Sequence, residues 1–272
     1  MTQSLCVVNT RPPPRQQDLT QHCAASGWQV LELCPITLEP TLTQRQLNNW
    51  RENLDAYTDI IVTSTVAVSI GVAWLSEFWP QWPVQTQWWA IGPATAKALD
   101  QFGIEPQIPN KFDSPALLQE LKSSWVERLA GSAPNQPAMD RLNNWRVLVV
   151  TGADGLGLIK QQLFELAIAH DVAEVYHRQE RELTQSQLLA CEALHSHLTA
   201  LVCTSSKILE LLDKQQIFSA KFKQRCYCIC ASERLCAVAT SKGFRKVINS
   251  GGASNLDLHA CIAATIQRAA LL

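Results

Sequence analysis

Residues 146–178 read RVLVVTGADGLGLIKQQLFELAIAHDVAEVYHR, and this stretch decides the fold of the chain. It begins with a short apolar, β-branched run, Val147–Val150, which is typical of a buried parallel strand. The chain must turn after this run, because Gly152 and two further glycines follow. Apolar residues then recur at helical spacing, and Val172–Tyr176 begins a second extended segment. The stretch therefore predicts a strand, a glycine loop, a helix and a second strand.

The same order of elements begins the chain, and the rest of the sequence repeats it. Val7-Val8 corresponds to Val149-Val150, and at almost the same offset Ile61–Thr65 corresponds to Val202–Ser206. Recurrence at a nearly constant offset is the signature of an internal repeat. Strands that alternate with helices predict parallel sheets covered on both faces. We therefore predict an α/β fold with two similar parallel-sheet α/β domains and a cleft between them.

Length and charge exclude several classes of protein. The 272 residues, of which 47% are hydrophobic, are enough for one large or two small domains, each with its own core. With a formal net charge of -1, the protein as a whole does not attract nucleic acid or an anionic membrane electrostatically. No apolar run approaches the length of a transmembrane helix. Local groups would therefore have to hold any polyanionic ligand.

The ten cysteines are scattered along the chain, and several fall inside predicted strands. The first residues, MTQSLCVVNTR, lack the profile of a signal peptide, so we expect a reducing cytoplasm rather than a disulfide framework. Cys226, Cys228 and Cys230 alternate along one strand-like run, which predicts that they face one side as small core residues. A zinc site is the alternative, although no C-x-x-C motif occurs and His195 with His197 forms an isolated pair.

The first half contains three further segments with a recognisable pattern. Ser114-Pro115 predicts the N-cap and the first position of a helix over residues 116–129. Ile108 is predicted as a short final strand. Residues 74–89 hold five tryptophans, which could stack on a ring ligand or, as is commoner, pack a long connection against the domain. Beyond these segments, the polar, proline-containing residues 130–144 predict a mobile linker.

Small polar residues follow the carboxyl ends of most predicted strands, where open α/β sheets bind their ligands. Many directly precede helices, so hydroxyls and the backbone N–H groups of helix N-termini could hold anions without lysines. Helix capping explains any one of these residues well, whereas their recurrence in both halves favours binding. The candidate substrate-binding residues at these strand ends are Arg11, Thr63, Ser64, Thr65, Gly92, Ser114, Gly152, Thr204, Ser205, Ser206 and Ser232.

Taken in order, these residues and their neighbours resemble the uroporphyrinogen-III synthase family. The resemblance covers almost the full chain and rests on order and spacing rather than on one diagnostic motif. The chain departs from the family in the tryptophan-rich stretch, in residues 130–144 and in the second-half turn at Cys230-Ala231 and Glu233. The matching residues are Thr10-Arg11-Pro12, Thr63-Ser64, Thr204-Ser205, the block Ile91–Leu99 (IGPATAKAL), Ser114 with Leu117-Leu118, and Glu174–Arg178 (EVYHR).

The resemblance implies that the two halves exchange elements. One domain would comprise residues 1–36 with 179–272, the other would comprise residues 39–175, and residues 30–36 and 172–178 would form a two-stranded connection. It also implies a monomer without a metal or an organic cofactor. The implied partner is a linear tetrapyrrole substrate, with neither nucleic acid nor a membrane, and a transient contact with the preceding enzyme of the pathway is compatible with it.

The reaction that the resemblance implies is cyclisation of hydroxymethylbilane to uroporphyrinogen III in haem biosynthesis. Water is lost and ring D is inverted through a spiro intermediate, and the substrate carries eight carboxylates. Tyr176 is the candidate proton donor, because its counterpart in the family motif is given that role. Packing at the domain junction is the alternative for Tyr176. Arg11 and Arg178 are candidates either for carboxylate contacts or for ion pairs at the hinge.

Two other classes of function stay open at this point. A non-catalytic, two-lobed cytoplasmic protein would use the same cleft to capture an anion or a tetrapyrrole. A nucleotide-dependent enzyme is less well supported, because Gly152, Gly155 and Gly157 do not form G-x-G-x-x-G and no P-loop lysine motif occurs. The isomer that the protein makes from hydroxymethylbilane would separate these functions.

Overall fold

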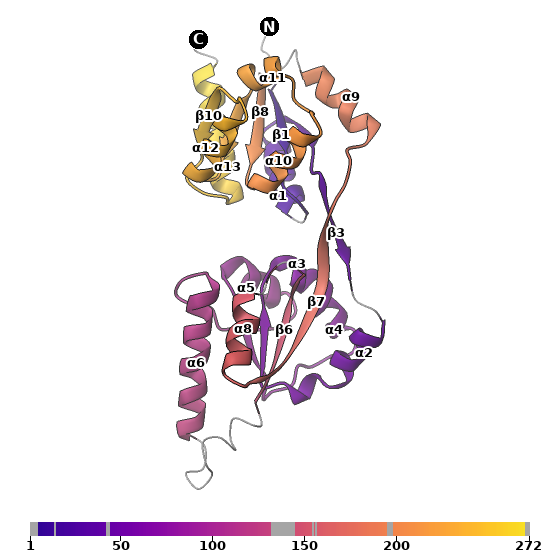
Figure 1. Ribbon diagram of the computed structural model, residues 1–272, viewed down its shortest axis with the longest axis vertical. Helices are drawn as coiled ribbons and strands as arrows, with labels where there is room; N and C mark the ends of the chain where they lie inside the picture. Colours follow the sequence, from indigo (N-terminus) through magenta and orange to yellow (C-terminus); the bar gives the residue numbers. More distant parts are fainter. Residues whose placement is uncertain are drawn as a thin grey trace. The chain divides into compact units, whose positions relative to one another are not determined.

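A computed structural model describes residues 5–13, 15–41, 44–131, 145–153, 155, 157–194 and 198–269. The chain divides into two compact units: unit 1, Met1–Leu38 with Gln179–Leu272, and unit 2, Glu39–Arg178. It therefore passes from unit 1 to unit 2 after Leu38 and returns after Arg178. Each unit contains its own sheet, flanked by helices (Figure 1).

Unit 1 is built on a five-stranded sheet with the strand order β10-β9-β8-β1-β2, in which all neighbouring strands are parallel. Successive residues of a strand point to opposite faces, so Cys6 and Val8 of β1 join one core cluster while Leu5 and Val7 join another. Helices α10 and α12 cover the first face, and α1 and α13 cover the second. The strands are β1 (Leu5–Asn9), β2 (Gln29–Glu32), β8 (Leu198–Cys203), β9 (Tyr227–Cys230) and β10 (Lys246–Asn249). The helices are α1 (Arg15–Ala25), α9 (Gln185–Ala193), α10 (Ser206–Lys214), α11 (Ala220–Arg225), α12 (Glu233–Ser241) and α13 (Asn255–Ala269).

Unit 2 contains the second sheet, with the order β3-β7-β6-β4-β5. From β7 to β5 the neighbouring strands are parallel. Helices α6 and α8 cover one face of the sheet. The strands are β3 (Ile36–Pro40), β4 (Asp59–Val62), β5 (Gln87–Ala90), β6 (Arg146–Gly152) and β7 (Ala169–Glu180). The helices are α2 (Gln44–Glu52), η1 (Leu54–Ala56), α3 (Thr65–Ala67), the π-helical turn η2 (Val68–Val72), α4 (Ala73–Ser76), α5 (Pro93–Asp100), α6 (Ser114–Gly131) and α8 (Gly157–Glu165).

The strands β3 and β7 pair along the two segments by which the chain passes between units. Thr41 N donates to Val175 O at 3.3 Å, and Arg181 N donates to Pro35 O at 2.9 Å. The partner number falls as the residue number rises, which is the pattern of antiparallel strands. β7 is twelve residues long and extends beyond the segment that its apolar pattern predicted.

The two sheets correspond in four neighbouring strands, and each sheet combines strands from both sequence halves. β2, β1, β8 and β9 occupy the positions in unit 1 that β7, β6, β4 and β5 occupy in unit 2. β1 and β2 come from the first half, whereas β8, β9 and β10 come from the second. The predicted fold class is confirmed: the fold is two similar parallel-sheet α/β units from an internal repeat.

Two local predictions in the first half are wrong. Ile108 is not in a strand, because only Gln107 forms a bridge, to Trp89, and the prolines on either side prevent a longer ladder. Ser114 is not the N-cap of α6. It is the first helical residue, and Asp113 Oδ1 accepts from Ala116 N at 2.9 Å. Asp is as good a cap as Ser, and the sequence Asp113-Ser114-Pro115 allows either choice.

The tryptophans pack within unit 2, as the commoner interpretation expected. Trp79 Nε1 donates to Arg51 O at 2.7 Å, and Trp82 Nε1 donates to Phe102 O at 2.8 Å. Trp82 also contacts Trp88 edge to face. These bonds tie the long connection before β5 to α2 and to the end of α5, so the indole rings stabilise the unit rather than offer a stacking surface.

The predicted core position of Cys226, Cys228 and Cys230 is confirmed, since all three belong to one buried cluster in unit 1. In the described part of the chain no group of three or more His, Cys, Asp or Glu side chains is placed to hold a metal ion. His195 and His197 lie outside the described residues, and so do residues 132–144 of the predicted linker, whereas residues 130–131 end α6. No helix among the described residues is both long and apolar enough to cross a membrane.

Candidate active site

Two threonine hydroxyls adjoin at the carboxyl edge of the sheet in unit 2. Thr63 directly follows β4 and Thr151 lies near the end of β6, and Thr63 Oγ1 donates to Thr151 Oγ1 at 2.8 Å. The backbone brings them together, because Thr63 N donates to Val150 O at 3.1 Å and so prolongs the pairing of the two strands. Sequence reasoning proposed Thr63 and missed Thr151. Its place in the glycine loop, directly before Gly152, was the available signal.

Ser64 places another hydroxyl beside Tyr176, the predicted proton donor. Ser64 Oγ lies 3.3 Å from the hydroxyl oxygen of Tyr176, and either group can donate. Ser64 is also the N-cap of α3, because its Oγ accepts from Ala67 N at 3.0 Å. Capping and the contact with Tyr176 are therefore made by the same oxygen. The side chain of Tyr176 is otherwise covered, since the residue is only 3% exposed.

Gly152 allows Tyr176 to take this position. β6 pairs in step with β7 as far as Thr151 and Glu174, and the register then shifts so that Gly152 is opposite Tyr176. Irregularities of this kind often re-aim a side chain beside a functional site. A Cβ on Gly152 would lie 2.5 Å from Cζ and 2.9 Å from the hydroxyl oxygen of Tyr176. Any larger residue at position 152 would displace the tyrosine ring.

Gly71 holds the segment that carries Ser64 close to the same strands. It lies in the π-helical turn η2, and a Cβ there would lie 2.7 Å from Cγ1 of Val150 and 2.9 Å from Cγ1 of Val175. These valines directly precede Thr151 and Tyr176 in the chain. Turns of this kind are frequent at functional sites. The absence of a side chain at Gly71 therefore lets η2 pack closely against β6 and β7, and sequence reasoning did not identify this contact.

The remaining candidates of unit 2 occupy neighbouring turns. Gly92 is the N-cap of α5, and its carbonyl accepts from Thr95 N and Ala96 N at 3.1 Å. Phe112 covers it, because a Cβ on Gly92 would lie 3.3 Å from Cβ of Phe112. Ser114 begins α6 two residues later, and Thr65 begins α3.

Arg178, the last residue of unit 2, lies near the predicted donor. Its guanidinium carbon is 5.8 Å from the ring centroid of Tyr176, at the outer limit of a cation–π contact. The structure therefore gathers Thr63, Ser64, Gly152, Tyr176 and Arg178 around one stretch of the carboxyl edge of unit 2.

In unit 1 a buried cation follows β1. Arg11 is 3% exposed, its Nη2 donates to Ala253 O at 3.0 Å, and its Nη1 donates to Asn255 Oδ1. Burial, together with repulsion by Arg15, lowers the pKa of this guanidinium to about 10, which leaves it charged at neutral pH. Both acceptors are neutral, and they tie the end of β1 to the start of α13. Sequence reasoning proposed Arg11 and did not identify Asn255.

The second-half turns of unit 1 differ in how their hydroxyls are used. Ser232 caps α12, accepting from Leu235 N at 3.4 Å, as in ordinary helix capping. Ser205 stands at the N-cap of α10, but its side chain makes no capping bond. Ser206 Oγ is buried and has no hydrogen-bond partner within the described residues. The turn that contains Thr204, Ser205 and Ser206 therefore keeps more of its hydrogen-bonding capacity for a ligand than the turn at Ser232.

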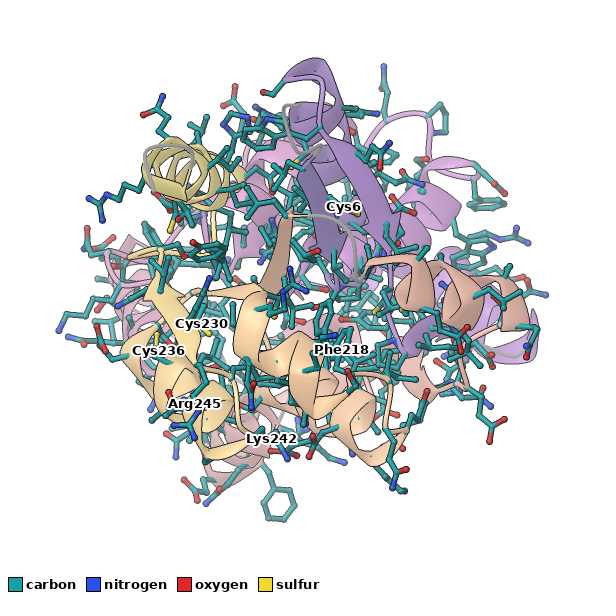
Figure 2. All side chains as sticks on the ribbon, turned by 90° about the horizontal axis from the view of Figure 1, so that it is seen from above. Cys6, Phe218, Cys230, Cys236, Lys242 and Arg245 are labelled. Atoms are coloured by element: carbon teal, nitrogen blue, oxygen red, sulfur yellow. The ribbon has the colours of Figure 1, made fainter. Side chains whose placement is uncertain are left out.

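Thiol groups lie directly beneath these two turns. Cys203 ends β8 and is paired in register with Cys230 at the end of β9. Cys228 Sγ lies 3.7 Å from Cys230 Sγ, and Cys236 of α12 adds a further thiol beside Cys230 (Figure 2). Burial raises the pKa of the Cys226 thiol in the same strand region to about 12. Cys203, Cys226, Cys228 and Cys230 belong to the buried apolar cluster of unit 1 and pack beneath the turns.

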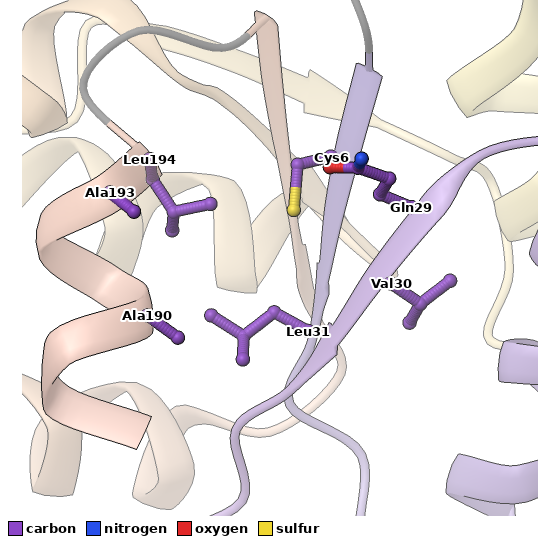
Figure 3. A pocket seen from close by; sticks show the side chains of 7 residues that line it. All are labelled: Cys6, Gln29, Val30, Leu31, Ala190, Ala193 and Leu194. Carbon is purple, nitrogen blue, oxygen red and sulfur yellow. The ribbon is translucent and has the colours of Figure 1, made fainter. Parts of the chain in front are cut away.

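A cavity of 410 Å³ in unit 1 lies apart from the candidate residues. It opens between β2 and α9, where Leu31 and Ala190 point toward one another across it (Figure 3). None of the predicted site residues lines it. Its walls are almost wholly apolar, with Gln29 as the polar exception, so they do not suit a ligand that carries several carboxylates.

The fold and the strand-end hydroxyls define a class of protein: a two-unit α/β protein whose candidate residues lie at the carboxyl ends of parallel strands. The profile of the uroporphyrinogen-III synthase HemD family matches residues 17–255. The chain therefore belongs to the uroporphyrinogen-III synthase family. This family consists of cyclising lyases of haem biosynthesis that act on a tetrapyrrole substrate, so the protein is an enzyme of that class.

Individual proteins are similar to the chain in sequence or in fold. The chain is 26% identical over 261 residues to the uroporphyrinogen-III synthase of Salmonella typhimurium, a match that covers 92% of this chain and 97% of the relative. Its fold is similar to that of a mutant uroporphyrinogen-III synthase from Thermus thermophilus, with a TM-score of 0.55, 13% identity and coverage of 97% and 98% of the two chains. The uroporphyrinogen-III synthetase of Helicobacter pylori has a TM-score of 0.53 at 15% identity, with coverage of 97% and 100%.

Proposed function

We propose that the protein cyclises hydroxymethylbilane to uroporphyrinogen III, with loss of water and inversion of ring D. The observation that carries this proposal is the contact of 3.3 Å between the Tyr176 hydroxyl and Ser64 Oγ at the carboxyl edge of unit 2, in a chain of the synthase family. The reaction needs a proton donor for the leaving hydroxyl and groups that hold carboxylates. The described strand ends supply candidates for both roles.

The carboxylates are proposed to bind at the turns that follow the strands. Hydroxyls and backbone N–H groups at helix N-termini favour anions without adding net charge, which suits a chain of formal charge -1. Ser206, with its unpartnered buried hydroxyl, supports such a role best in unit 1. The proposed substrate-binding residues are Arg11, Thr63, Ser64, Thr65, Gly92, Ser114, Gly152, Arg178, Thr204, Ser205, Ser206 and Ser232.

Tyr176 is proposed to protonate the leaving hydroxyl. The C–O bond breaks with both electrons on oxygen, and water departs. The carbon that remains is a cation stabilised by its pyrrole nitrogen. Ring D attacks it through the α carbon that is already bonded to the bridge from ring C, which gives the spiro intermediate. The bond between that α carbon and the bridge then breaks and leaves a second cation on the bridge carbon, which the free α carbon of ring D attacks. The proton lost when the pyrroles regain their aromaticity restores the phenol. Because Tyr176 is buried while Ser64 is only half-buried, Ser64 is proposed to share the proton with Tyr176 on its way to the substrate.

Substitutions at both hydroxyls test the proton step. Tyr176→Phe keeps the ring, so we expect normal folding and a fall in kcat of about 10²–10⁴-fold. Ser64→Ala is expected to lower kcat less and to cost about 1 kcal/mol of stability through the lost cap. Ser219→Ala is the matched control, because Ser219 caps α11 in the same way and lies at the opposite edge of its sheet. Near-normal turnover of Tyr176→Phe would remove Tyr176 from the mechanism.

If the two hydroxyls share one proton, their effects will not add. The double variant Tyr176→Phe with Ser64→Ala should then be no slower than Tyr176→Phe alone. Additive losses would assign Ser64 to substrate binding instead. The function as a whole is tested by the isomer that forms from freshly generated hydroxymethylbilane. Formation of isomer I alone, at the uncatalysed rate, would refute the proposed function.

Arg11 is proposed to contact a substrate carboxylate, because its described acceptors at Ala253 and Asn255 are neutral. Arg11→Gln should then raise KM by about tenfold, a loss of one charge-assisted hydrogen bond. Arg178→Gln separates a carboxylate contact of Arg178 from a role in the connection. Unchanged product binding in both variants would favour the structural roles. Binding is best measured with uroporphyrinogen III under anaerobic conditions.

We further propose a cytoplasmic monomer that makes a transient contact with the preceding enzyme of the pathway. The ten cysteines are all free thiols, which supports a reducing compartment. A transient contact would shorten the exposure of an unstable linear tetrapyrrole to water. Light scattering during gel filtration would test the monomer, and a second light-scattering peak on mixing the two enzymes would test the contact.

A further inference from the structure

The turn before α6 presents an aromatic ring and a cation that neither the family assignment nor the site residues above account for. Phe112 is 61% exposed although its Cβ lies against Gly92. Lys111 directly precedes it, is also exposed, and forms no ion pair with any described residue. A single exposed phenylalanine is common on protein surfaces, so exposure alone does not indicate a binding site. What matters is where Phe112 lies. Gly92 places this one at the carboxyl edge of unit 2.

This turn is held rigidly on α6. Glu120 Oε1 accepts from both the backbone N and Nδ2 of Asn110, each at 2.8 Å. At the other end, Asp113 N donates to Lys111 O at 2.9 Å, and Asp113 Oδ1 caps the helix. Lys111 and Phe112 therefore stand between two anchored residues. A ligand that binds them would have to order side chains only, which lowers the entropic cost of binding.

The two side chains differ chemically from the hydroxyls at this edge, where Arg178 supplies a further cation. Thr63, Ser64, Thr151 and Tyr176 offer hydroxyls, whereas the exposed side chain that lies against Gly92 is the apolar ring of Phe112. A linear tetrapyrrole consists of flat pyrrole rings that each carry carboxylates. Aromatic rings pack face to edge or offset against other rings, and an ammonium group binds a carboxylate. One pyrrole unit would satisfy both side chains together.

We propose that Lys111 and Phe112 are a substrate-positioning pair: Phe112 packs against one pyrrole ring, and Lys111 binds a carboxylate of the same ring. The proposal rests on the proposed function, since it names the part of that substrate which this turn holds. It places a pyrrole unit beside Phe112, near the N-terminus of α5. The pair makes no contact with the bond that breaks, so it acts on binding and orientation rather than on the proton step.

The ring is tested by removing and restoring it. Phe112→Ala should raise KM for hydroxymethylbilane about tenfold while kcat stays within about twofold, because only binding is lost. Phe112→Tyr keeps the ring and should restore KM. Phe164→Ala is the matched control: Phe164 is 77% exposed in the same unit but ends α8 at the opposite edge of the sheet, so its KM should not change.

The cation is tested through its charge. Lys111→Ala should raise KM about three- to fivefold at low ionic strength, and the difference from wild type should shrink as salt is added. Lys111→Arg keeps the charge and should retain the wild-type KM. Lys221→Ala, which removes an exposed lysine of α11 in unit 1, is the control and should leave KM unchanged.

The outcomes separate failure of this pair from failure of the proposed function. Absence of isomer III with the wild-type protein would refute the function itself. With isomer III formed, equal KM values for Phe112→Ala, Phe164→Ala and wild type would refute the pair. A fall in Tm of Phe112→Ala with unchanged KM would show that Phe112 only shields Gly92, and would refute the pair as well.

Discussion

The two ends of the parallel sheet in unit 2 carry polar groups of opposite kinds. At the amino end, Asp59 is 0% exposed, and its carboxylate accepts from Arg128 Nη2 at 2.6 Å and from two indole nitrogens. At the carboxyl end, neutral hydroxyls contact one another, as in the Thr63–Thr151 and Ser64–Tyr176 pairs. Charges at the amino end are thus paired internally.

This difference indicates which end of the sheet contributes to stability and which end contributes to activity. The indole donors to Asp59 are Trp89 Nε1 at 2.9 Å and Trp125 Nε1 at 3.1 Å, and Thr58 Oγ1 donates as well. Such a saturated carboxylate has no capacity left for a ligand, and it fastens α6 to β4 and β5. Hydroxyls at the other end can still exchange partners. We therefore expect substitutions at the amino end to change stability and those at the carboxyl end to change activity.

The largest effect is expected from Asp59→Ala. It would remove the acceptor that two buried indole N–H groups share with the half-buried Arg128 guanidinium, which should lower the free energy of unfolding by about 3–5 kcal/mol. Urea denaturation followed by tryptophan fluorescence measures this loss. The kcat of the molecules that remain folded should be unchanged, and a drop in kcat without loss of stability would contradict the division of roles.

Gly152→Ala should disrupt the contact between Ser64 and Tyr176 at the carboxyl end of the sheet. The added Cβ would meet the ring of Tyr176 at 2.5 Å, so the ring must move to relieve the clash. Misplacement of this kind is expected to lower kcat about 10²-fold, with a loss of stability of about 1–3 kcal/mol. Steady-state kinetics with hydroxymethylbilane, beside thermal unfolding, would measure both. Gly157→Ala is a suitable control, because nothing lies near its Cβ position.

Tyr57 at the amino end should make the stability of unit 2 depend on alkaline pH. Burial, and then the hydrogen bond of 2.9 Å to Asp171, raise the pKa of Tyr57 above its ordinary value of about 10. A raised pKa in the folded state contributes stability below the unfolded value and loses it as pH rises above about 10. Unfolding at about pH 8 and about pH 11 should reveal this decline, and Tyr57→Phe should lessen it by removing the titrating group.

The smallest effect is expected for the pair Arg146–Asp171. Arg146 donates to Asp171 Oδ2 through Nε at 3.0 Å and Nη2 at 2.8 Å, but both side chains are about a third exposed or more. Solvent screens such a pair, so Arg146→Gln should cost at most about 1 kcal/mol and less at high salt. Comparison with Asp59→Ala in the same denaturation series tests how far burial decides the importance of an ion pair at this end.

The regular parts of the fold could be predicted because their signals are local. The apolar run Val147–Val150, predicted to be a buried strand, lies within β6, and Gly27 and Gly103 follow their helices with positive φ. The repeat in turn predicted equivalent strand positions in the two sheets. Predictions failed where two neighbouring residues compete for one role, as with Asp113 and Ser114, or where prolines limit a strand, as at Ile108.

The candidate site could be predicted only in part. Thr63, Ser64, Gly152 and Tyr176 were identified because strand ends and the family motif mark them in the sequence. Gly71 was not, because its importance comes from contact with Val150 and Val175, which are far from it along the chain. The partner of Arg11 was missed for the same reason, since Asn255 is 244 residues away.

The sequence by itself determined the elements, the internal repeat and the strand ends at which a ligand would bind, because periodicity, glycines and helix caps act over a few residues. Only the tertiary structure decided which of those strand ends adjoin, since parallel pairing brings together residues that are distant in the chain. It placed the hydroxyls of Ser64 and Tyr176 3.3 Å from one another. At the other end of the same sheet, it surrounded the Asp59 carboxylate with hydrogen-bond donors. Pairing across strands is a property of packing, and no local pattern records it.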